Sequence, residues 1–273
     1  MTPRQRLGQH FLSDPGLLKK IAAALDPTPD DLVLEIGPGK GSLTQQLLAC
    51  GVRVIAIEKD RRLAEELRGR GNGEWGRVRI VEGDALLIDW ASLVGESPIR
   101  QSPAPAPAFK VIGNIPYNIT TPLIEKALTP PYPERIVFLV QAEVAERLAA
   151  RPGSKPYGGL SVGVQAQARV ERLFSVRAGA FQPPPRVDSA VVRLTPLGEP
   201  LIPPGDVAAF RRFVTACFSR RRKQLRNVVA GALARPAAVV AAGLASLGLD
   251  PAARPETLAP ADFVRLLRWG ATL

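Results

Sequence analysis

Apolar runs alternate with helical patterns over the first two thirds of the chain. Seven runs rich in β-branched residues predict strands, over residues 32–37, 52–60, 78–85, 109–114, 135–141, 168–176 and 189–194. Helical spacing follows several of them, over residues 42–49, 61–68, 121–128 and 142–149. This alternation predicts an α/β fold with a mostly parallel sheet covered by helices on both faces. Ligands of such sheets bind beyond the carboxyl ends of the strands, so the residues at those ends are the candidates for function.

The pattern changes near residue 200. Before that point, the Pro/Ala-rich residues 97–108 predict an extended surface connector, to which we assign no role. Residues 181–189 contain three consecutive prolines and cannot be helical, because proline lacks an amide donor. Farther on, Ala, Leu and Arg recur with helical spacing. We therefore expect a sheet domain over residues 1–198, with an N-terminal arm over 1–13, and a small all-helical domain over 199–273.

Composition limits the class of protein. A chain of 273 residues with 46% hydrophobic positions can form a large core, which excludes wholesale disorder. No run approaches the roughly 18 apolar residues of a membrane span, and the N-terminus has no apolar segment of signal-peptide length. The two cysteines, Cys50 and Cys217, have no metal-like spacing. We therefore expect no disulfide, no bound metal, no membrane anchor and a cytoplasmic location.

The charge indicates a polyanionic partner, either nucleic acid or an anionic membrane surface. The net charge of the chain is +11. Residues 199–273 hold 11 Lys/Arg against 5 Asp/Glu, so their net positive charge per residue is more than three times that of residues 1–198. A run of cations without an acid favours a phosphate-contacting surface over a merely solvated face. The predicted contacts lie within two helical turns, at Arg220, Arg221, Arg222, Lys223 and Arg226, and on the N-terminal arm, at Arg4 and Arg6.

The first strand ends carry a pattern typical of nucleotide-like cofactors. A Gly-x-Gly-x-Gly turn, Gly37, Gly39 and Gly41, lets the backbone approach a ligand without a Cβ in the way. Glu58 follows 21 residues after Gly37, where a carboxylate can accept both hydroxyls of a ribose, and Asp84 is placed to accept from an adenine amino group. Nicotinamide dinucleotide and S-adenosylmethionine (SAM) sites share this layout. The glycine spacing favours SAM, because pyrophosphate-binding dehydrogenases use Gly-x-Gly-x-x-Gly.

The fourth strand ends in "GNIPYNIT", residues 113–120, which has two interpretations. Asn and Pro are common turn formers, so the stretch can be a plain strand-to-helix turn. The chemical interpretation is methylation of an exocyclic amine, since the lone pair of adenine N6 is delocalised and needs acceptors that draw the amine toward tetrahedral geometry. The Asn114 oxygen and a main-chain carbonyl beside Pro116 are suitable acceptors, and a base can stack on Tyr117. Orientation then supplies most of the acceleration, without a general base.

These residues resemble the rRNA adenine N6,N6-dimethyltransferases, whose motif is Asn-(Ile/Leu)-Pro-(Tyr/Phe). The resemblance continues in order along nearly the whole chain, through "RLGQHFLSD" (6–14), "LEIGPGKGSLT" (34–44), "IEKD" (57–60), "EGDA" (82–85), "VQAEVAERL" (140–148), "KPYGGLSV" (155–162), "FQPPPRVDSAVVRL" (181–194) and "FSRRRKQLRN" (218–227). It is closer to the members that act on the small ribosomal subunit than to the drug-resistance members that act on the large one.

The resemblance implies a Rossmann-like, class I SAM-dependent methyltransferase sheet of seven strands followed by the helical domain. It implies that SAM, which is converted to S-adenosylhomocysteine, contacts His10, Leu12, Gly37, Gly39, Glu58, Asp84 and Asn114. The catalytic residues are then Asn114, Pro116, Tyr117 and Phe181, with the target adenine between Tyr117 and Phe181. His10 stands where many relatives have Asn.

The leading hypothesis is dimethylation of two adjacent adenines near the 3′ end of small-subunit rRNA, with an immature small subunit as the substrate and the enzyme as a monomer. A second hypothesis is methylation of a large-subunit adenine. The third is a ribosome-assembly or transcription factor with the same fold and no catalysis, which the intact Asn114, Pro116 and Tyr117 disfavour.

Overall fold

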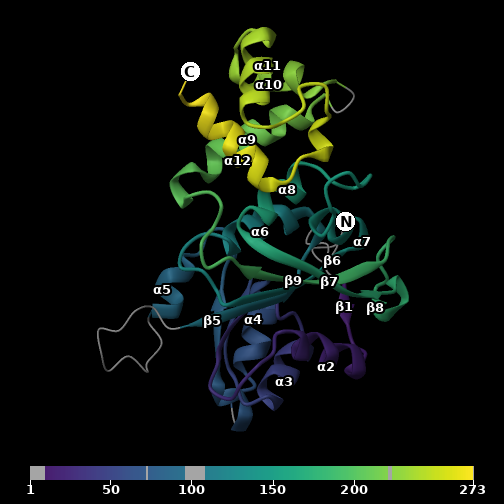
Figure 1. The fold of residues 1–273 in the computed structure, drawn as a ribbon. Coiled ribbons are helices and arrows are strands. Elements are labelled where there is room, and N and C mark those ends of the chain that lie inside the picture. The colour runs from purple at the N-terminus through teal and green to yellow at the C-terminus, as the bar shows by residue number, and fades with distance from the viewer. Residues whose placement is uncertain (1–9, 72, 96–107, 221–222, 273) are drawn as a thin grey trace. The chain divides into compact units, whose positions relative to one another are not determined.

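A computed structural model describes residues 10–71, 73–95, 108–220 and 223–272. The chain divides into two compact units (Figure 1). The first comprises Met1–Ala145 and Glu171–Pro196, and the second comprises Glu146–Val170 and Leu197–Leu273. The second unit therefore takes a segment that the sequence analysis assigned to the sheet domain. That segment belongs there because Tyr157, Val162 and Ala166 are buried in the core of the helical unit.

The first unit is built on a seven-stranded sheet in the order β4-β3-β2-β5-β6-β9-β7. Its strands are β2 (Leu32–Ile36), β3 (Arg53–Glu58), β4 (Val78–Glu82), β5 (Phe109–Asn114), β6 (Arg135–Gln141), β7 (Ala168–Val176) and β9 (Ser189–Pro196). The first five are parallel, and β9 is antiparallel to β6. The predicted fold class and its seven strands are confirmed.

The parallel strands end at one edge of the sheet. Ile36 at the end of β2 pairs with Ile57 on one side and Gly113 on the other. Every residue of β2 is buried, as expected for a parallel strand covered on both faces. The register therefore brings the residues that follow β2, β3 and β5 to one place.

Helices cover both faces of this sheet, with α2, α3 and α4 on one face and α6 on the other (Figure 1). The helices that follow the early strands are α2 (Pro15–Ala24), α3 (Ser42–Ala49), α4 (Arg61–Arg68), α5 (Trp90–Gly95), α6 (Thr120–Ala127) and α7 (Ala142–Leu148). The Asp60 carboxylate caps α4 by accepting from the Leu63 amide at 3.2 Å. The short 3-10 turns are η1 (Gly73–Arg77), η2 (Tyr117–Ile119), η3 (Ala178–Ala180), η4 (Pro204–Asp206) and η5 (Pro255–Thr257).

A two-stranded sheet joins the start of the described chain to a distant segment. Strand β1 (Phe11–Leu12) pairs antiparallel with β8 (Phe181–Gln182). Leu12 and Phe181 are partners in this ladder, and both are buried with the first unit's core. The pair holds the segment that begins at His10 beside the edge of the large sheet where the parallel strands end.

The second unit is helical. Its helices are α8 (Gly159–Gln165), α9 (Val207–Phe218), α10 (Leu225–Leu233), α11 (Ala237–Ser246) and α12 (Pro260–Gly270). Phe210, Phe213 and Phe263 fill its core, and the buried Tyr157 hydroxyl donates to the Leu258 carbonyl at 2.8 Å. Among the described residues, no one helix has the length and hydropathy to cross a membrane; α10 and α11 pass that test only as a pair bent by 112°.

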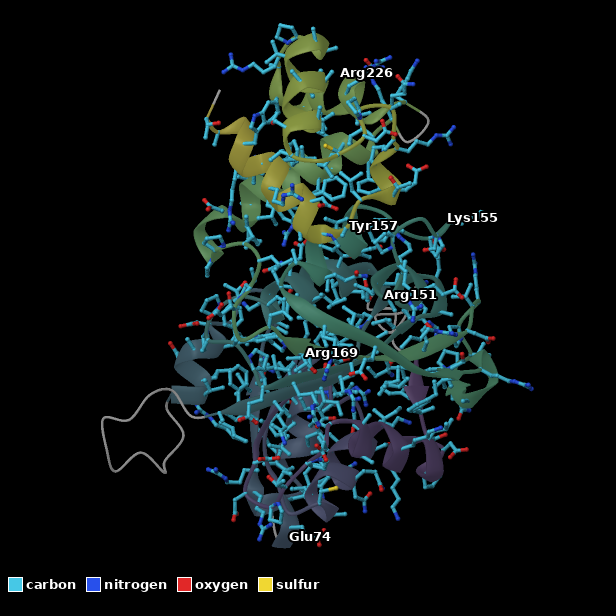
Figure 2. The ribbon with its side chains drawn as sticks, in the orientation of Figure 1. Glu74, Arg151, Lys155, Tyr157, Arg169 and Arg226 are labelled. Atoms are coloured by element: carbon cyan, nitrogen blue, oxygen red, sulfur yellow. The ribbon has the colours of Figure 1, made fainter. Side chains whose placement is uncertain are left out.

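The basic run of the second unit does not form the continuous helix that the sequence predicted. Helix α9 ends at Phe218 and α10 begins at Leu225, so Arg220 and Lys223 lie in the connection, and Arg221 and Arg222 lie outside the described residues. The helix breaks because the Leu225 and Arg226 amides donate to the carbonyls of Ala253 and Pro251 instead of to a preceding turn. Arg226 is exposed in the first turn of α10 (Figure 2).

Candidate functional site

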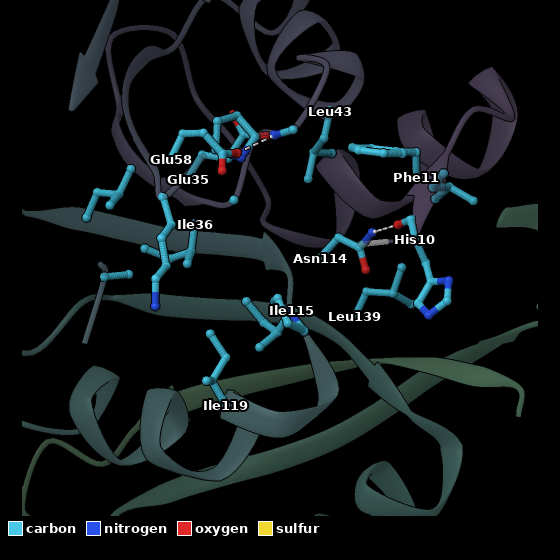
Figure 3. Close-up of a pocket in the computed structure, with 18 of the residues that line it drawn as sticks. His10, Phe11, Glu35, Ile36, Leu43, Glu58, Asn114, Ile115, Ile119 and Leu139 are labelled. Atoms are coloured by element: carbon cyan, nitrogen blue, oxygen red, sulfur yellow. Dashed lines mark hydrogen bonds between the residues drawn. The ribbon is translucent and has the colours of Figure 1, made fainter. Parts of the chain in front are cut away.

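A pocket lies over the carboxyl ends of β2, β3 and β5 and is bordered by the β1 segment (Figure 3). It brings together most of the site residues predicted from the sequence: His10, Leu12, Gly37, Gly39, Glu58, Asp84, Asn114, Pro116 and Tyr117. Among the predicted catalytic and cofactor-binding residues, all of which are described, Phe181 is the exception. Phe181 is 4% exposed, lies in the core of the first unit, and is not among the residues that line the pocket.

Gly37 and Gly39 of the glycine turn line the pocket. The Gly37 amide donates to the Ile57 carbonyl at 2.9 Å, which ties the turn to the neighbouring strand β3. Gly39 has φ +58°, and a Cβ there would lie 3.0 Å from the Phe11 ring. Only glycine combines this left-handed backbone with so close an approach. The turn therefore offers bare backbone to the pocket.

Glu58 fixes the glycine turn as well as lining the pocket. Its carboxylate accepts from the Gly39 amide at 3.0 Å and from the Asp60 amide at 2.8 Å. The residue is 4% exposed, and burial raises the pKa of its carboxyl. Each carboxylate oxygen has a second lone pair, so the group can still accept hydrogen bonds from a ligand.

Asp84 is held ionised on the next strand end. The Lys59 ammonium lies 2.7 Å from one carboxylate oxygen, and the Leu86 amide donates to the other at 2.9 Å. The hydrogen bond from Lys59 is the main reason that the pKa of Asp84 lies below its usual range. The loop after Asp84 is held by Lys126 of α6, whose ammonium donates to the carbonyls of Leu86 and Ile88 at 2.8 and 2.6 Å.

Glu35 is a pocket residue that the sequence analysis did not identify. It lies within β2, is 1% exposed, and accepts from the Thr44 hydroxyl at 2.7 Å. Burial, with the neighbouring charge of Glu58, raises the pKa of the Glu35 carboxyl to about 7. The signal was present in the sequence, because an acid inside the otherwise apolar run "LVLEIG" requires a special environment.

Asn114 presents its side-chain oxygen to the pocket. Its amide nitrogen donates to the His10 carbonyl at 2.8 Å (Figure 3). Since a carbonyl can only accept, the nitrogen must face His10 and the oxygen must face away. The His10 ring is held in turn, because its Nδ1 donates to the Pro183 carbonyl at 2.8 Å. Residues from three distant segments thus orient this oxygen.

Tyr117 and Pro116 follow Asn114 at the pocket wall. The Pro116 carbonyl accepts from the Ile119 amide at 3.1 Å and so closes the turn η2. The Tyr117 ring faces the His10 ring at a centroid distance of 6.0 Å and an interplanar angle of 29°. Its hydroxyl lies 2.9 Å from the Ser189 hydroxyl. Asn114 and Tyr117 both line the pocket, which therefore holds an amide group and an aromatic ring near the end of β5.

The predicted RNA contacts belong to other parts of the chain. Arg220, Lys223 and Arg226 are exposed cations of the second unit. The remaining predicted contacts, Arg4, Arg6, Arg221 and Arg222, lie outside the described residues.

Comparisons with known proteins identify the family to which the chain belongs. The family model described as ribosomal RNA adenine dimethylase matches residues 1–269. Two curated relatives are named ribosomal RNA small subunit methyltransferase A. The one from Nitrosococcus oceani is 44% identical, over 97% of this chain and 95% of the relative. The one from a Synechococcus species is 46% identical, over 97% of this chain and 91% of the relative.

Solved structures agree as well. A dimethyladenosine transferase from Plasmodium falciparum matches with a TM-score of 0.78 at 29% identity, over 94% of this chain and 96% of that one. The 23S rRNA methyltransferase ErmE matches with a TM-score of 0.71 at 28% identity, over 95% and 98%. These matches confirm the resemblance inferred from the sequence motifs.

Proposed function

The chain belongs to the ribosomal RNA adenine dimethylase family, and from this we propose that it methylates N6 of two adjacent adenines near the 3′ end of small-subunit rRNA. It is a SAM-dependent rRNA adenine dimethyltransferase that acts on the small subunit. The observation that carries the chemistry is the fixed orientation of Asn114, whose oxygen faces the pocket beside Tyr117.

The pocket fits SAM by the chemistry of its side chains. The bare backbone at Gly37 and Gly39 leaves room for a ligand, and the Glu58 carboxylate retains lone pairs for the two ribose hydroxyls. Asp84 is a charged acceptor suited to the adenine amino group. When bound, SAM supplies an electrophilic methyl group on a positively charged sulfur. We assign Leu12 and the backbone or ring of His10 to the same cofactor surface.

The protein's part in the reaction is orientation. The Asn114 oxygen accepts from the target amine and draws its nitrogen toward tetrahedral geometry, with a main-chain carbonyl beside Pro116 as the second acceptor. Tyr117 stacks on the base. The amine nitrogen forms the new bond to the methyl carbon as the carbon–sulfur bond breaks, and its proton then leaves to water. Proximity and orientation lower the barrier, so no general base is required.

Phe181 needs a change of position for its proposed role. Phe181 is buried in the β1–β8 ladder, where its backbone pairs with that of Leu12, so stacking on the adenine requires that the Phe181 ring leave its present position when RNA binds. We keep Phe181 as a proposed second stacking residue on the family resemblance alone.

We further propose that residues 1–198 bind SAM and residues 199–273 contact rRNA through exposed cations such as Arg220, Lys223 and Arg226. Exposed cations contact phosphates and so position RNA without reading its sequence. The substrate is then an immature small subunit, and the enzyme acts as a monomer in the cytoplasm.

Methyl transfer from labelled SAM to isolated ribosomal subunits tests this function. We expect label in N6,N6-dimethyladenosine of small-subunit rRNA and none in large subunits. Label in large subunits alone would contradict the proposal in favour of the large-subunit reaction. Binding to small subunits without label would favour an assembly factor that lacks catalysis.

A further inference from the structure

Residue Ser189 closes the "FQPPPRVDS" segment and has no part in the mechanism above. It is fully buried at the start of β9, where it pairs with Gln141 at the end of β6. A buried hydroxyl needs a hydrogen-bond partner. Here the partner is the hydroxyl of Tyr117, 2.9 Å away and 72 residues distant in sequence. The contact joins the sheet to the residue on which the adenine is proposed to stack.

The backbone beside Ser189 is held firmly. The Asp188 carbonyl accepts from the Ala142 amide at 2.9 Å, and the Asp188 carboxylate accepts from the Ala178 amide at 2.9 Å. These bonds tie Asp188 to the residues after β6 and β7. The Ser189 hydroxyl is therefore a fixed point of the sheet and not part of a loose loop.

The Tyr117 side chain requires a fixed hydrogen-bond partner to hold its orientation. Tyr117 begins the single turn η2, and its main chain is fixed by the bond from Ile119 to Pro116. That bond leaves the two side-chain torsions of Tyr117 free. The ring is only half-buried and borders the pocket. Holding the hydroxyl at one end of the ring fixes both torsions at once.

We propose that Ser189 is a positioning residue for methyl transfer, which holds the Tyr117 ring in the orientation that directs a stacked adenine amine toward the Asn114 oxygen. The inference rests on the proposed function. Loss of this orientation slows the chemical step, because a misplacement of about 1 Å can cost about a hundredfold in rate. SAM binding should not change, since Ser189 is not among the described residues that line the pocket.

A double-mutant cycle tests the proposal. Single-turnover methylation of small subunits, at saturating SAM, is measured for Ser189→Ala, Tyr117→Phe and the double variant. We expect each single change to lower the rate about tenfold and the double change to do no more, because both remove the same hydrogen bond. Ser189→Thr keeps the hydroxyl and should recover most of the rate. Calorimetry should give Ser189→Ala and Ser189→Thr the wild-type SAM affinity.

Thr195 supplies the matched control. It lies on the same strand, and its hydroxyl is buried without a hydrogen-bond partner in the described part of the chain. Thr195→Val should therefore methylate at the wild-type rate.

Wild-type rates in Ser189→Ala and Tyr117→Phe would overturn the proposal, and so would two losses that multiply in the double variant. If Ser189→Ala does not fold, Tyr117→Phe decides alone, because it removes the same bond. A wild-type enzyme that leaves small subunits unmethylated contradicts the proposed function instead, so the two failures are distinguishable.

Discussion

Replacing Glu35 with glutamine should stabilise the protein at alkaline pH. The side chain is 1% exposed, and burial followed by the charge of Glu58 raises the pKa of its carboxyl from 4.5 to about 7. The folded state therefore binds this proton more tightly than the unfolded state does. The contribution of Glu35 to stability is most favourable below pH 4.5, declines as the pH rises from there to about 7, and is least favourable above that.

The magnitude follows from the shift in pKa. One unit corresponds to about 1.4 kcal/mol, so a rise from 4.5 to about 7 amounts to about 3 kcal/mol of unfolding free energy lost above neutral pH. Glutamine has the same shape without the charge, and its oxygen can still accept from the Thr44 hydroxyl. Glu35→Gln should therefore remove most of the loss.

Urea denaturation followed across the acid-to-alkaline range measures this effect. We expect Glu35→Gln to exceed the wild type by up to about 3 kcal/mol in free energy of unfolding at alkaline pH, and to approach it near the unfolded-state pKa of a carboxyl. Glu66→Gln, which changes an exposed acid of α4, is the control and should follow the wild type. Parallel pH profiles for wild type and Glu35→Gln would refute the reasoning, because the carboxyl would then titrate alike in both states.

Three further changes address cofactor, chemistry and RNA. Glu58→Ala should weaken SAM binding about tenfold or more, because a charge-assisted acceptor contributes roughly 1.5–3 kcal/mol; unchanged calorimetric affinity in a folded variant would remove Glu58 from the site. Asn114→Ala should lower the single-turnover rate by about 10²–10³ at saturating SAM while RNA affinity survives; near-normal methylation would mean that "NIPY" is only a turn. Changing Arg220, Lys223 and Arg226 to Ala should weaken the salt dependence of RNA binding, with SAM affinity unchanged. The slope of log affinity against log salt concentration should fall by roughly 0.7 to 0.9 for each phosphate contact that is lost. A slope equal to that of the wild type would mean that these cations only face solvent.

The sheet and its ligand-facing edge could be predicted from the sequence because each motif directly follows its own strand. Gly37 follows β2, Glu58 ends β3 and Asn114 ends β5. Parallel pairing aligns these ends by register, so no knowledge of long-range contacts was needed. The apolar run of each strand was sufficient to place it.

Contacts between distant segments could not be predicted in this way. The hydrogen bond from Asn114 to His10 joins residues 104 apart, and that from His10 to Pro183 joins residues 173 apart. Both depend on the two-residue β1–β8 ladder, which is too short to leave a pattern in the sequence. The same ladder buries Phe181, whose aromatic character alone suits a core residue and a stacking residue equally.

Two buried acids, Glu35 and Glu58, help to decide between SAM and a nicotinamide dinucleotide, the two cofactors whose sites share the glycine turn. Glu35 and Glu58 both line the pocket, both are almost fully buried, and burial raises the pKa of each carboxyl. Their charges also oppose one another, so the pair disfavours the folded state when both are ionised. A ligand that carries positive charge reverses this, because it favours the ionised form of both carboxyls. The sulfonium of SAM meets that requirement, whereas the pyrophosphate of a dinucleotide would add further negative charge to the same pocket.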